Sequence, residues 1–194
     1  MFREVLRQCG GLAEAQVREL EAHYRALCRW NRVLNLTRIE DVGEAVSRHY
    51  CESLFLAAWI PDGARVVDVG SGAGFPGFPL AVAKPGCVVT LLESHQRKAV
   101  FLKEVSRGIP NIRVVAKRAE DLEGSFDWVV SRAVGYEVLG KVVRRWGARL
   151  ALLTGGDEAP VEWKLEWDSI AVPGGKQRYL RVSRETSSTF HVKQ

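Results

Sequence analysis

The fold is decided by the stretch Val66-Val67-Asp68-Val69-Gly70-Ser71-Gly72-Ala73-Gly74-Phe75-Pro76-Gly77. An apolar run leads directly into closely spaced glycines, and a segment that tolerates proline in its first helical turn follows. Glycines let a backbone approach a ligand closely, and a helix N-terminus offers N–H donors and a positive partial charge to an anion. The stretch therefore predicts a buried strand, a ligand-binding loop and a helix, with a small anionic ligand at the N-terminus of that helix.

Short valine-rich apolar runs recur on both sides of the glycine loop and indicate strands. They lie at residues 65–69, 88–92, 112–116, 128–131 and 150–153, and each is followed by a segment able to form a helix or a turn. Runs that are apolar on both faces and separated by helices are typical of a parallel sheet covered on both sides. Residues 163–172 and 178–183 predict two more strands, which form an antiparallel hairpin at one edge because a Pro-Gly-Gly-Lys turn joins them. We predict a doubly wound α/β domain over residues 61–194.

Residues 1–60 differ from the rest of the chain and predict a helical N-terminal extension packed on that domain. Apolar residues recur at helical spacing within residues 12–36, with arginines and glutamates between them. A second helix is expected to begin at Asp41, which can cap it while Glu44 reaches back three residues later. It ends before Pro61-Asp62-Gly63.

The composition places the chain among ordinary globular proteins. Its 194 residues are 46% hydrophobic and 26% charged, and 28 basic against 23 acidic side chains give a net charge of +5, which is compatible with a nucleic-acid partner. The four cysteines, Cys9, Cys28, Cys51 and Cys87, form no CxxC pair and no zinc-ligand spacing, so we expect neither a metal site nor a disulfide framework. No apolar run is long enough to span a membrane. These features predict a cytoplasmic protein without membrane attachment, and we expect a monomer.

Two cofactor classes compete for the glycine loop. Gly72, Gly74 and Gly77 satisfy the dinucleotide pattern GxGxxG, and Glu93 lies at a suitable distance to bind a ribose. A carboxylate at Asp68, however, would repel a pyrophosphate at the mouth of the loop. S-adenosylmethionine carries no phosphate, and its ammonium group tolerates an acidic loop. The charges therefore favour S-adenosylmethionine, with Glu93 accepting from both ribose hydroxyls, over a dinucleotide and over a tight turn that binds nothing.

The chain resembles a known family, the bacterial small-subunit ribosomal RNA guanine-7 methyltransferases, also called RsmG or glucose-inhibited division protein B. The resemblance covers most of the chain. It rests on Trp30-Asn31-Arg32-Val33-Leu34-Asn35-Leu36-Thr37, Arg48-His49-Tyr50-Cys51-Glu52-Ser53-Leu54, the loop from Asp68 to Gly77, and Ser131-Arg132-Ala133.

The resemblance implies a class I S-adenosylmethionine methyltransferase with a Rossmann-like sheet, an antiparallel edge hairpin, and activity on nitrogen 7 of a guanine in 16S ribosomal RNA. The partner is then small-subunit ribosomal RNA or the assembled small subunit. The implied cofactor-binding residues are Asp68, Gly70, Gly72, Gly74, Phe75, Glu93 at the ribose, Ala119 and Glu120 at the adenine, and Arg132 beside the transferable methyl group. Arg118 and Arg178 resemble basic residues at the family's RNA-facing rim.

The segment after the fourth strand separates possible target atoms. It lacks the Asn/Asp-Pro-Pro-aromatic turn typical of exocyclic amine methylation, and no cysteine lies nearby as carbon-5 methylation of pyrimidines requires. Nitrogen 7 of guanine has an exposed lone pair and no proton to remove, so no general base is expected. Arg132 is the expected catalytic residue, orienting the guanine or the cofactor; a simple ion pair with a neighbouring carboxylate is the alternative.

Further basic residues predict RNA contacts if they share the face around the pocket, although solvated helix faces are the alternative. They are Arg25, Arg29, Arg32, Arg38, Arg97, Lys98, Lys103, Arg107, Arg144, Arg145, Arg178, Arg181 and Arg184.

One position departs from the family pattern. The family usually has a lysine and a glycine after the fifth strand, whereas this chain has Thr154 followed by Gly155. This leaves open a diverged member with weak or no activity that acts as a cofactor-binding, RNA-associated module. A small-molecule methyltransferase on the same fold is a further alternative.

Overall fold

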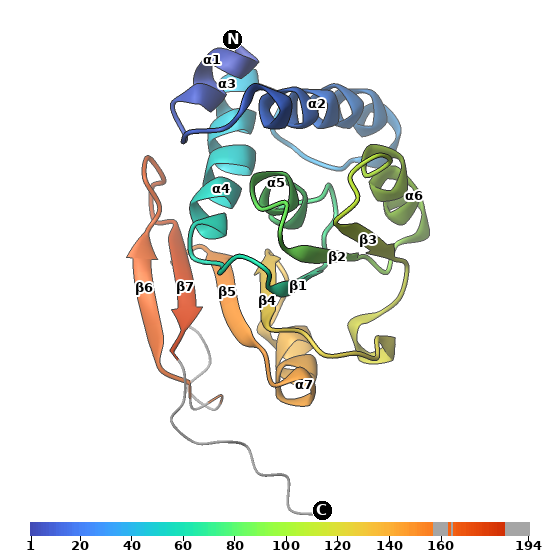
Figure 1. Cartoon of the computed structure of the whole chain (residues 1–194), viewed down its shortest axis with the longest axis vertical. Coiled ribbons are helices and arrows are strands. Elements are labelled where there is room, and N and C mark those ends of the chain that lie inside the picture. The colour runs from blue at the N-terminus through green and yellow to red at the C-terminus, as the bar shows by residue number, and fades with distance from the viewer. Residues whose placement is uncertain (157–162, 164, 185–194) are drawn as a thin grey trace, which may run out of the picture.

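A mixed seven-stranded sheet forms the centre of the computed structural model, which describes residues 1–156, 163 and 165–184 (Figure 1). The strand order is β3-β2-β1-β4-β5-β7-β6. The strands are β1 (Arg65–Val69), β2 (Val88–Leu92), β3 (Ile112–Val115), β4 (Trp128–Arg132), β5 (Arg149–Thr154), β6 (Trp167–Ala171) and β7 (Tyr179–Ser183). β1 to β5 run parallel, and β7 pairs antiparallel with both β5 and β6. The predicted doubly wound sheet and its edge hairpin are confirmed, but the first hairpin strand begins at Trp167 rather than Trp163.

Helices cover the two faces of the sheet unequally. The helices are α1 (Phe2–Arg7), α2 (Glu14–Leu34), α3 (Val42–Ala45), the π-helix η1 (Val46–Cys51), α4 (Glu52–Ala57), α5 (Gly77–Ala83), α6 (Gln96–Val105), the 3₁₀ turn η2 (Ala119–Asp121) and α7 (Tyr136–Trp146). Figure 1 shows α7 on the opposite side of the sheet from α2, α5 and α6.

Two hydrophobic clusters fill the spaces between these layers. In the larger one, Leu20 of α2 and Tyr50 of η1 pack with residues of α5 and with the β1 side chain Val66. In the smaller one, Val67 of β1 packs with Leu139 of α7 and with its neighbours. Adjacent valines of β1 therefore point into different clusters, as expected for a strand that is buried on both faces.

The helix predicted to begin at Asp41 forms as one continuous helical run, and it contains a π-helical segment. Asp41 Oδ1 accepts a hydrogen bond of 2.8 Å from the backbone N–H of Glu44, so the predicted cap is confirmed. The Glu44 side chain does not reach back; it pairs with Arg48 at 2.9 Å. Residues 46–51 then form the π-helix, which joins α3 to α4 without leaving the helical backbone conformation. Such widened turns occur frequently at functional sites, and this one carries His49 and Tyr50.

No disulfide framework was expected, and against this expectation Cys9 and Cys51 form a disulfide with a Cα–Cα distance of 5.3 Å. They are 42 residues apart and meet because α1 packs on η1, a tertiary contact that cysteine spacing does not reveal. Cys28 and Cys87 are free. Within the described ranges, no helix is long and apolar enough to cross a membrane.

Candidate functional site

The glycine loop lies at the carboxyl end of β1, the edge where parallel α/β sheets bind ligands. Gly70, Gly72 and Gly74 adopt φ values of +71°, +55° and +93°, which other residues rarely tolerate. The N–H groups of Gly70 and Ser71 donate to the Leu92 carbonyl at 2.9 and 3.0 Å, which ties the loop to the end of β2. A Cβ atom at Gly70 would lie 2.5 Å from the Val134 side chain. The loop is therefore held close to the segment that follows β4.

Asp68 has a different role from the one predicted. It is fully buried rather than at the mouth of the loop, and its Oδ2 accepts a hydrogen bond of 3.0 Å from Gly77 N–H at the start of α5. The Phe78 and Leu80 N–H groups donate to the Gly74 and Pro76 carbonyls, so the chain itself uses the donors of this first turn. The predicted anion site at the helix N-terminus is therefore wrong.

The second oxygen of Asp68 remains available. Asp68 Oδ1 is buried and has no hydrogen-bond partner among the described residues. Burial raises the pKa of Asp68 to about 7, although the hydrogen bond from Gly77 opposes the shift. A buried acceptor without a partner is unfavourable unless a ligand or water completes it.

Glu93 lies across the loop from Asp68, at the end of β2. Its Oε2 accepts from Gly72 N–H at 2.8 Å, and its Oε1 accepts from His95 N–H at 2.7 Å. Each carboxylate oxygen has two lone pairs, so both retain capacity to accept one further hydrogen bond. The predicted ribose-binding acid thus also fixes the loop.

An aromatic cluster from the N-terminal helices supports the other side of the loop. His23 lies 2.7 Å from the Tyr50 hydroxyl through Nδ1 and 3.0 Å from the Ala73 carbonyl through Nε2. Because a carbonyl only accepts, Nε2 carries the proton and Nδ1 accepts from Tyr50. His49 stacks on Phe75 with ring centroids 4.7 Å apart. Burial lowers the pKa of both His23 and His49 to about 3, so both rings are neutral.

A cavity of about 220 Å³, here called the loop cavity, lies between the glycine loop and η2. Gly70, Arg118, Ala119, Glu120 and Val134 contribute to its lining. The structure therefore brings the predicted adenine contacts together with the loop. Arg118, predicted to face RNA, also lines this cavity.

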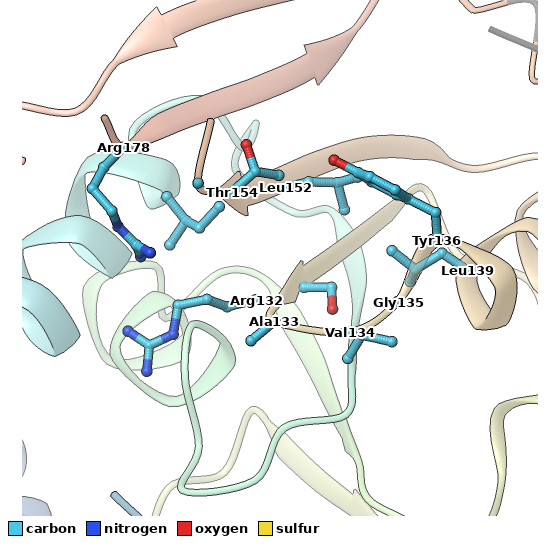
Figure 2. A pocket seen from close by; sticks show the side chains of 12 residues that line it. Arg132, Ala133, Val134, Gly135, Tyr136, Leu139, Leu152, Thr154 and Arg178 are labelled. Carbon is cyan, nitrogen blue, oxygen red and sulfur yellow. The ribbon is translucent and has the colours of Figure 1, made fainter. Parts of the chain in front are cut away.

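A second cavity, of about 300 Å³, lies between the carboxyl ends of β4 and β5, and Figure 2 shows its lining side chains. We call it the arginine cavity, because Arg132 and Arg178 contribute to its wall. Val134 lines both cavities. It therefore lies between the predicted adenine contacts, Ala119 and Glu120, and the predicted catalytic residue, Arg132. Figure 2 shows the guanidinium groups of Arg132 and Arg178 reaching to the same side of the cavity.

The two arginines have different electrostatic surroundings. Arg178 donates from Nε and Nη2 to Glu52 at 3.0 and 2.5 Å, a two-point ion pair with a buried carboxylate. Arg132 donates to the Arg48 carbonyl at 2.9 Å, and its guanidinium carbon lies 5.2 Å from the centre of the Phe75 ring. Burial lowers the pKa of Arg132 to about 10, which leaves it charged at neutral pH. The alternative that Arg132 is held in an ion pair is not found among the described residues.

The sequence did not identify Val134 and His23 as site residues, and it singled out Thr154 only as a departure from the family pattern. Val134 has an ordinary apolar side chain, and the spacing of the histidines gave no sign that His23 reaches Ala73. Several predicted RNA contacts lie in ion pairs instead: Arg25 with Glu21, Arg29 with Glu104 and Arg184 with Asp168.

The sequence is similar to proteins that modify ribosomal RNA. A model of the family described as rRNA small subunit methyltransferase G matches residues 16–172. Curated proteins named ribosomal RNA small subunit methyltransferase G include one from Stenotrophomonas maltophilia that is 38% identical over 89% of both chains. Another, from Nitrosococcus oceani, is 44% identical over 63% of this chain. The alignment spans 58% of the length of that relative and 60% of one from Chromobacterium violaceum.

Solved structures with low sequence identity share the fold. A SAM dependent methyltransferase from Aquifex aeolicus superposes with a TM-score of 0.59 at 16% identity, covering 77% of this chain and 96% of that one. The M. jannaschii TYW2 structure in complex with AdoMet gives a TM-score of 0.53 at 17% identity, covering 68% and 72%. The predicted class I methyltransferase fold is confirmed.

Proposed function

The chain belongs to the rRNA small subunit methyltransferase G family, and we propose that it transfers a methyl group from S-adenosylmethionine to nitrogen 7 of a guanine in 16S ribosomal RNA. One observation carries this proposal beyond the family: the described lining of the arginine cavity contains no Asp, Glu, His or Cys side chain. A lining without a carboxylate, an imidazole or a thiol offers no efficient base at neutral pH, and this suits an acceptor atom that already has a free lone pair.

The residues around the glycine loop fit S-adenosylmethionine. The unpartnered Asp68 Oδ1 supplies a buried acceptor for the ammonium group, and the remaining lone pairs of Glu93 suit ribose hydroxyls. Ala119 and Glu120 line the loop cavity, where an adenine would lie. A dinucleotide is disfavoured because the α5 donors that would hold its pyrophosphate are already used by Asp68 and by backbone carbonyls.

The chain contributes to the reaction chiefly by positioning. When bound, S-adenosylmethionine supplies an electrophilic methyl group for an in-line displacement. Phe75 and Val134 border the transfer region with apolar surface, which excludes water. Arg132, charged and without a carboxylate partner in the described ranges, orients the guanine at its oxygen edge or the cofactor. No proton has to be removed from nitrogen 7, so no described residue acts as a base.

The substrate is expected to be small-subunit ribosomal RNA, free or assembled into the small subunit. Arg118 and Arg178 border the two cavities and support an RNA-facing role for this edge of the sheet. Transfer to in vitro transcribed 16S ribosomal RNA, compared with transfer to isolated unmethylated small subunits, distinguishes the two forms of the substrate.

The test is incorporation of a tritiated methyl group into these RNAs, with mapping of 7-methylguanine. The Gly72→Asp variant adds a carboxylate beside Glu93, and we expect about 100-fold weaker cofactor binding and a matching loss of transfer, since two like charges then share the loop. Gly86→Asp is the control, because Gly86 is exposed and a Cβ there contacts nothing closer than 3.8 Å. Methylation by the wild-type protein elsewhere than at nitrogen 7, or undiminished transfer by Gly72→Asp, contradicts the proposal.

A further inference from the structure

Arg181 of β7 lies beside the β5 residues that line the arginine cavity. The antiparallel register places it directly opposite Leu152 of β5, and side chains of paired residues project from one face. Leu152 and Thr154, two residues apart on β5, both line the cavity. Arg181 Nε donates a hydrogen bond of 3.1 Å to Thr154 Oγ1. The guanidinium group therefore lies directly behind a cavity-lining hydroxyl.

The charge of Arg181 is not neutralised within the described part of the chain. The residue is only 8% exposed, yet its terminal nitrogens donate to no described residue and it forms no ion pair there. Arg178, by comparison, is paired with Glu52, and Arg184 is paired with Asp168 at 2.7 Å. A buried cation without an anion destabilises the folded protein. A chain that keeps such a group therefore offers a candidate site for an anionic ligand.

Thr154 extends this charge toward the cavity. Its oxygen accepts from Arg181, so its own hydroxyl hydrogen remains free to donate, and no other hydrogen bond of this side chain is found among the described residues. Figure 2 shows Thr154 at the cavity wall. The hydroxyl and the guanidinium together form a donor pair with a net positive charge.

We propose that Arg181 and Thr154 bind a phosphate group of the RNA chain adjacent to the nucleotide being methylated. The inference rests on the proposed function, which supplies the RNA. A phosphate suits the pair because an arginine and a hydroxyl both donate to its oxygens. A bidentate contact of Arg181 with the guanine edge is disfavoured, since it would occupy nitrogen 7, the atom that must remain free. Arg181 thereby supplies, from the neighbouring strand, the cation that the family pattern leads one to expect at position 154.

The test measures the affinity for in vitro transcribed 16S ribosomal RNA at several KCl concentrations. For Arg181→Met we expect about tenfold weaker binding at low salt, and a log–log salt slope smaller in magnitude by about 0.7, the contribution of one phosphate contact. Arg184→Met is the matched control, because that arginine follows the same strand but is already paired with Asp168. An unchanged slope in Arg181→Met, or an equal change in Arg184→Met, overturns the proposal.

Thermal unfolding separates binding from a structural role. Replacing a buried, unneutralised cation by a methionine of similar length should leave the midpoint unchanged or raise it by a few degrees. A lowered midpoint together with an unchanged salt slope would assign Arg181 to the structure alone.

Should Arg181→Met not fold, Thr154→Glu tests the same charge from the cavity side. Thr154 is only partly buried and borders open volume, so a glutamate fits there and can pair with Arg181. The same reduction in salt slope is expected, and an unaltered slope contradicts the inference. Methyl transfer by the wild-type protein is measured in parallel: its absence defeats the proposed function, whereas normal transfer with an unchanged slope defeats only the phosphate site.

Discussion

The glycine loop between β1 and α5 and the wall of the arginine cavity, which meet at Val134, satisfy their polar groups differently. In the loop, Glu93, His23 and the first turn of α5 are bonded to other parts of the chain. In the wall, Arg132 is a cation without a carboxylate partner among the described residues, and so is Arg181 directly behind the wall residue Thr154. The protein's own bonds therefore fix the shape of the loop, which keeps only acceptors available for a ligand, at Asp68 Oδ1 and Glu93. The wall, by contrast, keeps donors available.

Glycine substitutions are expected to give the largest difference in the free energy of unfolding between the glycine loop and the wall of the arginine cavity. A Cβ at Gly77 would lie 2.5 Å from Leu91 Cδ2 and 2.7 Å from Asp68 Cβ, and both of these side chains are buried. We expect Gly77→Ala to lower the free energy of unfolding by about 3 kcal/mol, because nothing around it can move without breaking the Asp68 bond. Urea unfolding measures the loss, and the thermal midpoint should fall by about 9 °C.

Gly155→Ala is the matched control on the opposite wall. Gly155 lines the arginine cavity, and a Cβ there would meet no atom of the described residues within 4 Å. Its unfolding free energy should stay within about 0.5 kcal/mol of the wild-type value. Equal losses in the two variants would show that the loop is no more tightly packed than the wall.

The pH dependence of stability tests whether the loop depends on neutral histidines. His23 and His49 have a pKa of about 3 in the folded protein against 6.5 when unfolded, so their contribution is complete above pH 6.5 and is lost as the pH falls. Asp68, with a pKa raised from 3.8 to about 7, acts in the opposite sense over this window. Each group changes the unfolding free energy by about 1.4 kcal/mol per pH unit. Because Asp68 offsets one of the two histidines, the wild-type protein should lose about 2 kcal/mol between pH 6.5 and 5.

Removing one histidine should flatten this profile. His49→Phe keeps an aromatic ring against Phe75 but cannot be protonated, so the remaining histidine and Asp68 cancel. Asp68→Asn removes the opposing group and should make the acid-induced loss steeper by about 1.4 kcal/mol per pH unit. Urea titrations at intervals of about half a pH unit measure both slopes, and parallel profiles for all three proteins would contradict the assignment of these pKa shifts.

The sequence predicted those features that depend on local pattern. The valine-rich runs and the glycines gave β1 to β5 and the loop, since periodicity and the need for positive φ are visible in the chain itself. Asp41 was correctly identified as a cap for the same reason.

Features that depend on tertiary contacts were predicted poorly. Asp68 was placed at the mouth of the loop, because the sequence does not show that Oδ2 turns back to Gly77. The pairing of Cys9 with Cys51 and the contact of Arg181 with Thr154 join residues 42 and 27 positions apart. Their geometry is set by the packing of α1 on η1 and by the β5–β7 register, neither of which residue spacing encodes.

Glu52→Gln removes the charge that neutralises Arg178 in the wall of the arginine cavity. It is expected to change stability less than Gly77→Ala does. The amide keeps one acceptor for Arg178 but carries no charge, so the guanidinium becomes available to RNA. We expect stability to fall by about 1 kcal/mol, while RNA affinity at low salt rises about fivefold and the salt slope grows by about 0.7. The opposite responses of stability and binding are informative, because a purely structural Arg178 predicts the first without the second. If stability and RNA affinity both fall, Arg178 serves the structure of the protein, as the bonded groups of the glycine loop do.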